Sequence, residues 1–86
     1  MCLILNDGTV IENGQAWNPG GVLRCFFDGY TIEAAATLFF DPTKTERITF
    51  QSDGTEEVFE GYTDCTGIEL DAQNYVHVSL RKGAET

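Results

Sequence analysis

Four acidic side chains lie close together in the second half of the chain, and their chemistry is that of a binding surface: Glu56, Glu57, Glu60 and Asp64. Carboxylates bind Arg and Lys side chains through charge-assisted hydrogen bonds. Alternate side chains of a β-strand share a face, so Glu56 and Glu60 are expected on one face and Glu57 on the other. At most three of the four carboxylates are expected to align. The cluster predicts a surface for a basic protein partner, and the alternative is a charged edge that prevents edge-to-edge aggregation.

Aromatic side chains offer a second kind of contact. Trp17 falls within a loop predicted over residues 13–21, where Gly, Asn and Pro cluster. Trp side chains anchor many protein interfaces, so Trp17 is a candidate hydrophobic contact. Phe26 and Phe27 are neighbours on a predicted strand and point to opposite faces. We expect the predicted helix to cover the ring that leaves the core; if it does not, that ring marks a contact surface.

Residue types suited to catalysis or metal binding are few and scattered. His77 is the only histidine, and the strand pattern places it on a polar face. A nucleophilic pair of His77 with Cys25 or Cys65 requires a contact that their spacing does not indicate. Cys2, Cys25, Cys65 and His77 are suitable zinc ligands but lack the clustered spacing of structural zinc sites. We predict no catalytic site, no metal site and no cofactor.

The charge balance limits the classes of partner. Fourteen Asp and Glu against five Lys and Arg give a formal net charge of −9 on 86 residues. Nucleic acid and anionic membrane surfaces both repel such a chain, because binding them requires clusters of Lys and Arg. The complementary partner is a basic protein surface, a common feature of nucleic-acid-binding proteins. We therefore predict a basic protein surface as the partner, and no direct binding of nucleic acid or membrane.

Cysteine number and hydropathy indicate the cellular location of the protein. Three cysteines without tight spacing favour reduced thiols in the cytoplasm over a disulfide framework. No stretch approaches the ~18 apolar residues of a membrane span, and the apolar run over residues 1–5 is too short for a signal peptide. The chain length predicts a single domain over residues 1–86.

The elements that must position these side chains are mostly short strands. The turn Asn6-Asp7-Gly8 between two apolar runs predicts a hairpin over residues 1–12. Alternation and turn residues predict further strands at 22–27, 48–51, 56–62, 67–70 and 75–81. In the last of these, the alternation puts apolar residues on one face and His77 on the other. The end of the chain, residues 82–86, is expected to fray.

One helix is predicted between the strands. Thr31 is its expected N-cap, and Asp41-Pro42 ends it. Its apolar stripe is expected to contain Ile32, Ala35, Ala36 and Phe39, flanked by Phe40. The order of elements predicts an α+β fold, mainly an antiparallel β-sheet or a small open barrel with one short helix.

Several short segments recur in order along the chain and carry a resemblance: Leu5-Asn6-Asp7-Gly8-Thr9, Thr31-Ile32-Glu33, Leu38-Phe39-Phe40, Glu46-Arg47-Ile48-Thr49-Phe50 and Gly61-Tyr62-Thr63. On these segments the chain resembles short proteins encoded in phages and prophages of Gram-positive, Firmicutes-type bacteria, often among late or tail genes. The resemblance implies a viral origin and work inside a bacterial host cell. It carries over no binding or catalytic residues.

Two functional hypotheses follow. The first is a small acidic inhibitor of a host nucleic-acid-binding defence protein, in the manner of anti-CRISPR and DNA-mimicking proteins. Glu56, Glu57, Glu60 and Asp64 would supply the carboxylates, and Trp17 a hydrophobic anchor. The alternative is a virion, tail or assembly protein that forms a homo-oligomer. The charge excess favours the inhibitor, because an oligomeric structural protein does not require it; a small enzyme ranks last.

Overall fold

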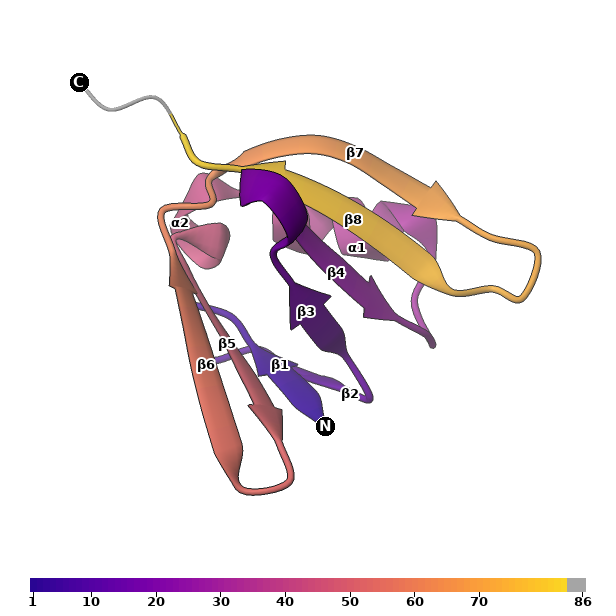
Figure 1. Cartoon of the computed structure of the whole chain (residues 1–86). Coiled ribbons are helices and arrows are strands. Elements are labelled where there is room, and N and C mark those ends of the chain that lie inside the picture. Colours follow the sequence, from indigo (N-terminus) through magenta and orange to yellow (C-terminus); the bar gives the residue numbers. More distant parts are fainter. Residues whose placement is uncertain (84–86) are drawn as a thin grey trace.

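Two four-stranded antiparallel sheets form most of the fold (Figure 1). The structure, a computed structural model, describes residues 1–83. The first sheet contains β1 (Cys2–Ile4), β2 (Val10–Glu12), β5 (Arg47–Ser52) and β6 (Thr55–Glu60), in the order β2-β1-β5-β6. The second contains β3 (Gln15–Trp17), β4 (Leu23–Phe27), β7 (Asp64–Leu70) and β8 (Val76–Arg81), in the order β3-β4-β8-β7. The predicted α+β fold, mainly antiparallel β, is confirmed.

Each sheet consists of two hairpins that meet through their inner strands. In the first sheet β1 pairs with β5, and in the second β4 pairs with β8. The predicted hairpin at the start of the chain is present: the side chain of Asp7 accepts a hydrogen bond from the Thr9 backbone N–H at 2.9 Å, and Leu5 N–H donates to the Thr9 carbonyl at 2.8 Å. The strands β2, β6, β3 and β7 are left as the sheet edges.

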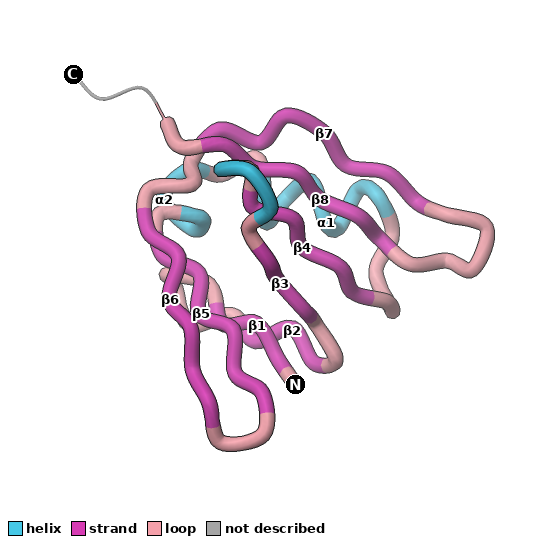
Figure 2. Tube along the Cα trace, in the orientation of Figure 1, coloured by secondary structure: helices cyan, strands magenta, loops and turns pink. Residues whose placement is uncertain are grey.

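Along the chain, both α-helices follow β4 and precede β5, and a short 3₁₀ turn lies at Pro19–Gly21; helices are cyan in Figure 2. Thr31 caps α1 (Ile32–Phe39), since its hydroxyl accepts a hydrogen bond from the Ala34 N–H at 3.1 Å. The single turn α2 (Pro42–Thr45) follows, although the sequence analysis assigns Asp41-Pro42 only to the end of the helix. Pro fits the first turn of a helix, where no intrahelical N–H bond is needed.

The predicted apolar stripe of α1 is only partly correct. Ala35 and Phe39 are fully buried, whereas Ile32 is 45% exposed and Phe40 is 58% exposed. The helix is eight residues long and ends at Phe39, so Phe40 is its C-cap and Ile32 belongs to its first turn. The last helical residue, Phe39, is still buried against the sheet, whereas the side chains of Ile32 in the first turn and of the C-cap Phe40 lie outside the buried contact.

The predicted loop over residues 13–21 is also only partly correct. It contains β3, and Trp17 is the last residue of that strand. Asn13 adopts a positive φ of 60°, so the chain turns sharply between β2 and β3. The strand has three residues and one buried side chain, Ala16, which is too short a pattern to recognise by alternation.

The inward faces of both sheets contribute to one core. Leu3, Ile48 and Phe59 from the first sheet and Phe27 and Val78 from the second are all buried in it. The ring of Phe27 stacks on that of Phe39 at a centroid distance of 5.5 Å, which fixes α1 against the inner face of the second sheet. The predicted alternation of β8 is confirmed, with Val76, Val78 and Leu80 buried.

Phe26 corrects the expectation that the helix covers both neighbouring rings. The helix covers the Phe27 face, and Phe26 lies half-buried on the opposite face of the sheet. Its ring stacks on Tyr75 at 4.6 Å between centroids, with an interplanar angle of 10°. Side chains of the same sheet therefore shield Phe26 in place of the helix.

Gly14 gives a test of the contact between the start of β3 and the core. A Cβ atom at Gly14 would lie 2.8 Å from Cγ and 2.9 Å from Cδ1 of Leu3, which is fully buried. Gly14→Ala should therefore lower the free energy of unfolding by about 1–3 kcal/mol through overpacking, measured by urea denaturation. The control is Gly67→Ala, where a Cβ meets nothing within 4 Å and no loss is expected. Equal losses in both variants would contradict this packing.

Thr45 gives a test of the cost of burying a hydroxyl group without a hydrogen-bond partner. Its side chain is fully buried, and within residues 1–83 its hydroxyl has no hydrogen-bond partner. Thr45→Val removes that hydroxyl at nearly constant volume and should raise the free energy of unfolding by about 1 kcal/mol. The control Thr43→Val removes a hydroxyl that donates to Asp41 and should bring no gain. Destabilisation of the Thr45 variant would show that its hydroxyl is satisfied.

Candidate functional site

The hairpin formed by β5 and β6 carries most of the acidic residues singled out in the sequence. Its two-residue loop is Asp53-Gly54, with positive φ angles of 46° and 81°, as a type I′ turn requires. Six successive residue pairs join the strands without a register shift, from Ser52 and Thr55 at the turn to Arg47 and Glu60 at the base. The side chains of this hairpin are therefore held in a regular two-stranded ladder.

The free end of this hairpin is exposed on both faces. Residues 53–58 are all exposed in succession, and burial begins only at Phe59. Ile48 and Phe59 lie opposite each other and anchor the base of the hairpin in the core. Figure 1 shows the turn projecting away from the rest of the molecule. We name Asp53, Glu56, Glu57 and Glu60 on this element the acidic hairpin residues.

The predicted carboxylates do not form a single row. Glu56 and Glu60 share the outer face of the first sheet, as predicted, and Glu57 lies on the opposite face across from Phe50. Asp64 belongs to the other sheet, where it lies opposite Arg81 at the start of β7. The chain leaves β6 at Gly61, whose φ is 83°, and this turn carries Asp64 away from the hairpin.

Trp17 is likewise separated from the acidic hairpin. It is 42% exposed and lies opposite Arg24 on the outer face of the second sheet. The inner faces of the two sheets contribute to one core, so Trp17 and Glu56 lie on outer faces of different sheets.

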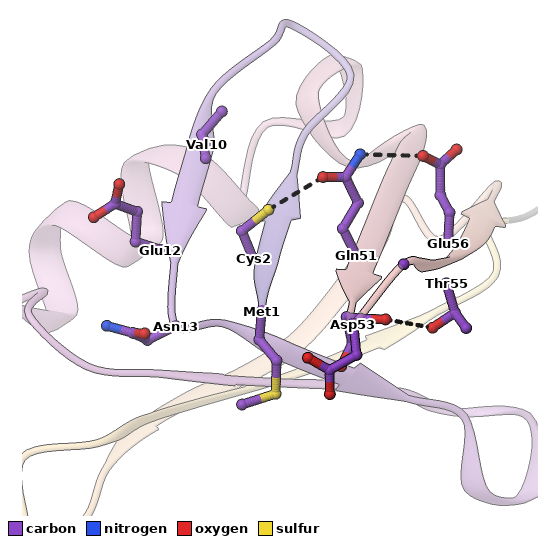
Figure 3. Close-up of a pocket in the computed structure, with 11 residues that line it drawn as sticks. Met1, Cys2, Val10, Glu12, Asn13, Gln51, Asp53, Thr55 and Glu56 are labelled. Atoms are coloured by element: carbon purple, nitrogen blue, oxygen red, sulfur yellow. Dashed lines mark hydrogen bonds between the residues drawn. The ribbon is translucent and has the colours of Figure 1, made fainter.

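Two further acidic residues, Glu12 and Asp53, lie near Glu56 and were not among the predicted binding residues. Glu12 and Glu56 occupy the same row of the outer face, in the order Glu12, Cys2, Gln51, Glu56 across four strands. Figure 3 shows this row from solvent. The hairpin register alone would have placed Glu12 opposite Cys2, but the pairing of β1 with β5 was needed to bring Glu56 into the row.

Hydrogen bonds join the middle of this row. Gln51 Nε2 donates to Glu56 Oε2 at 3.1 Å, and the Cys2 thiol donates to Gln51 Oε1 at 3.6 Å (Figure 3). These bonds restrict the side chain of Glu56 before any partner binds. An open hollow of about 590 Å³ lies beside the row, with Glu12, Asp53 and Glu56 among its lining residues. The site therefore offers carboxylate oxygens on an open surface.

The outer face of the second sheet has a different character. His77 Nε2 lies 2.8 Å from Asp71 Oδ2, and the His77 ring lies 4.9 Å from that of Phe26. The predicted position of His77 on the polar face is correct. Cys25 pairs with Val78 and faces the core, so the sheet itself separates its thiol from the imidazole. Burial raises the pKa of the Cys25 thiol, which keeps it protonated at neutral pH.

The four residues considered as zinc ligands, Cys2, Cys25, Cys65 and His77, do not lie together. Cys65 lies opposite Leu80 on the inner face of the second sheet, and burial raises the pKa of its thiol. Cys2 lies on the outer face of the first sheet. Cys2 and His77 therefore lie on outer faces of different sheets, with Cys25 and Cys65 between them.

Three of the fourteen acidic residues have a structural part in turns. The side chains of Asp7, Asp41 and Asp71 each accept hydrogen bonds from backbone N–H groups two residues later in the chain. Hydrogen bonds lower the pKa of each carboxyl group, chiefly from Thr9 to Asp7, from Thr43 to Asp41 and from His77 to Asp71. Turn formation therefore explains why these three positions are acidic. It does not explain why the acidic hairpin residues are acidic.

Comparison of the chain with protein-family models, with curated proteins and with solved structures finds no match. The resemblance to phage and prophage proteins therefore stays a prediction. Within residues 1–83, neither α1 nor α2 has the length and apolar character of a membrane-spanning helix.

Asp71 gives a pH-dependent test of the turn between β7 and β8. Its pKa in the folded protein lies below the ordinary 3.8, because His77 and the backbone N–H groups of Tyr75 and Gln73 bind its charged form. The charge therefore stabilises the fold above that ordinary pKa, and the contribution is lost as pH falls through the lowered pKa. Asp71→Asn should lower Tm at pH 7, and the difference from the native protein should shrink at acidic pH. A difference that is constant with pH would contradict this.

Proposed function

We propose that this protein is a non-catalytic inhibitor that binds a basic surface of a host nucleic-acid-binding protein through the acidic hairpin. The observation that carries the proposal is the run of exposed residues 53–58, which places carboxylates on both faces of one projecting element. The hairpin from residue 47 to 60 contains four acidic residues and a single basic one, Arg47, at its base. It is therefore a local source of negative charge in a chain of net charge −9.

Charge complementarity supports the choice of partner. Arg and Lys that line a nucleic-acid groove are spaced to meet phosphates, and carboxylates on a narrow hairpin offer the same kind of acceptor oxygens. A net negative charge also steers the protein toward positive surfaces and speeds association. The partner would then be blocked from its nucleic acid by competition for the same side chains, as anti-CRISPR and DNA-mimicking inhibitors act.

The order within the hairpin supports binding without large rearrangement. The type I′ turn and the regular ladder set the strand geometry, and Gln51 restrains Glu56. Fewer rotamers are lost on binding when a side chain is already held. The resemblance to phage and prophage proteins supports a bacterial cell as the place of action and a defence nuclease as one class of partner. Trp17 and Asp64 fall outside this proposed surface.

A second candidate function is a homo-oligomeric phage tail or assembly component. It is favoured by a row of three apolar residues and one threonine across the outer face of the first sheet, in the order Val10, Ile4, Thr49, Val58. Val10 is 51% exposed and Val58 is 37% exposed. Such an interface would depend weakly on salt, because its contacts are mainly apolar.

The experiment is an affinity capture from a lysate of Gram-positive cells at low and high salt, with partners identified by mass spectrometry. We expect a nucleic-acid-binding protein that is released by salt or by competing DNA. The triple variant Glu56→Gln, Glu57→Gln and Glu60→Gln should bind it at least about tenfold more weakly.

The matched control removes the same number of charges elsewhere, by Glu33→Gln, Asp64→Asn and Glu69→Gln, and should retain binding. Equal weakening in both variants would mean that net charge alone acts and the hairpin is not the site. Recovery of the bait alone, or of salt-resistant copies of this chain, would overturn the inhibitor and favour the oligomer.

A further inference from the structure

The edge strand β6 differs from the three other sheet edges. Strands β2 and β3 have three residues each. Strand β7 is longer, but its register shifts between Cys65 and Gly67, and such a bulge disrupts pairing with a further strand. Strand β6 has six residues in unbroken register, and its pairing partner among residues 1–83 is β5 alone. It is therefore the edge best suited to accept another strand.

The hairpin register shows which backbone groups of β6 are free. In a hairpin with a two-residue loop, the pair that flanks the loop is hydrogen-bonded, and hydrogen-bonded pairs then alternate along the ladder. Here that pair is Ser52 and Thr55. The same alternation continues to Gly61, whose N–H donates to the Glu46 carbonyl at 2.8 Å. The intervening residues therefore direct their N–H and C=O groups away from β5: Glu56, Val58 and Glu60.

The same three residues share one face of the sheet. Their side chains alternate acid, apolar, acid along the outer face of β6, and all three are exposed. A strand added at this edge would place its own residues directly opposite them, with Cβ atoms about 4.5–5.5 Å away. The side chains that fit are basic, apolar and basic at alternate positions.

We infer that β6 accepts an extended segment of its partner by strand addition, and that this segment carries Lys or Arg on either side of an apolar residue at alternate positions. This inference rests on the proposed function, and it specifies the form of the basic surface. The backbone hydrogen bonds would supply affinity, and the side chains of Glu56, Val58 and Glu60 would select the sequence.

The charges also decide against a second copy of the chain as the occupant. Antiparallel pairing of two β6 strands about Val58 would place Glu56 of each copy opposite Glu60 of the other. In-register parallel pairing would bring each glutamate next to its own equivalent. Like charges directly opposite each other destabilise a strand pair, so the edge repels its own copy and attracts a basic segment.

The test uses a synthetic peptide with Lys, Val and Lys at alternate positions and Thr at the positions between them. The peptide is titrated into the full chain at low salt, and binding is followed by NMR. We expect the backbone N–H signals of Glu56, Val58 and Glu60 to shift, and exchange of these hydrogens with solvent to slow. The N–H of Glu57 faces β5 and serves as the internal control. Absence of binding at millimolar peptide would overturn strand addition.

A matched pair of variants separates strand addition from charge attraction. Val58→Pro removes an outward N–H but no bond to β5, and Pro is tolerated on edge strands in this position. Val58→Thr keeps the N–H and has a similar shape. We expect Val58→Pro to bind the peptide about tenfold more weakly than Val58→Thr, since an edge hydrogen bond is lost and the proline ring obstructs pairing. Circular dichroism and urea denaturation check that both variants fold.

The outcomes distinguish this inference from the proposed function. If both Val58 variants bind equally while the triple glutamine variant does not, the acidic hairpin is the site and strand addition is wrong. The same conclusion follows if a peptide with methylated backbone nitrogens binds as well as the parent. If the triple glutamine variant also binds the peptide normally, both the inference and the proposed function fail.

Discussion

The pairing of β5 between β1 and β6 is the interaction on which the functional account depends. Strand β5 is bonded to both neighbours, and Ile48 is fully buried at the base of the hairpin. Phe59 on β6 lies opposite Ile48 and is buried in the same core. The core therefore fixes one end of the hairpin, and the free end, residues 53–58, is left to solvent. Both the exposed carboxylates and the open edge follow from this arrangement.

The acid surplus of the chain separates into parts with different physical roles. The side chains of Asp7, Asp41 and Asp71 accept backbone hydrogen bonds, so they form turns and would be retained in a protein without any partner. Glu56, Glu57 and Glu60 lie on a regular strand, where glutamate has low β-propensity. Local structure does not require these side chains, and on this exposed edge they also oppose pairing with a second copy of the chain.

The parts of the fold that depend on local signals were predictable. The Asp-Gly turns, the Thr31 cap and the alternation in β8 each arise within a few residues, and all are present. Strand β3 was missed because a three-residue strand has too little pattern. The exposure of Ile32 and Phe40 could not be predicted, because the residues with which a helix contacts a sheet are decided by tertiary packing.

The candidate site was predictable only in part, for the same reason. Alternation along one strand correctly placed Glu56 and Glu60 together and Glu57 opposite. It could not show that Glu12 joins their row, because that depends on the pairing of β1 with β5. Nor could it show that Asp64 and Trp17 leave the surface, since the assignment of strands to two sheets is decided by the whole core.

The central claim is that the acidic hairpin is the surface that contacts a basic protein. The most direct measurement is amide hydrogen exchange across the whole chain, with and without the captured partner at low salt. The account predicts slower exchange at residues 53–60, led by Glu56, Val58 and Glu60, and little change elsewhere. Protection centred on Trp17 and the outer face of the second sheet, with the hairpin unchanged, would contradict it.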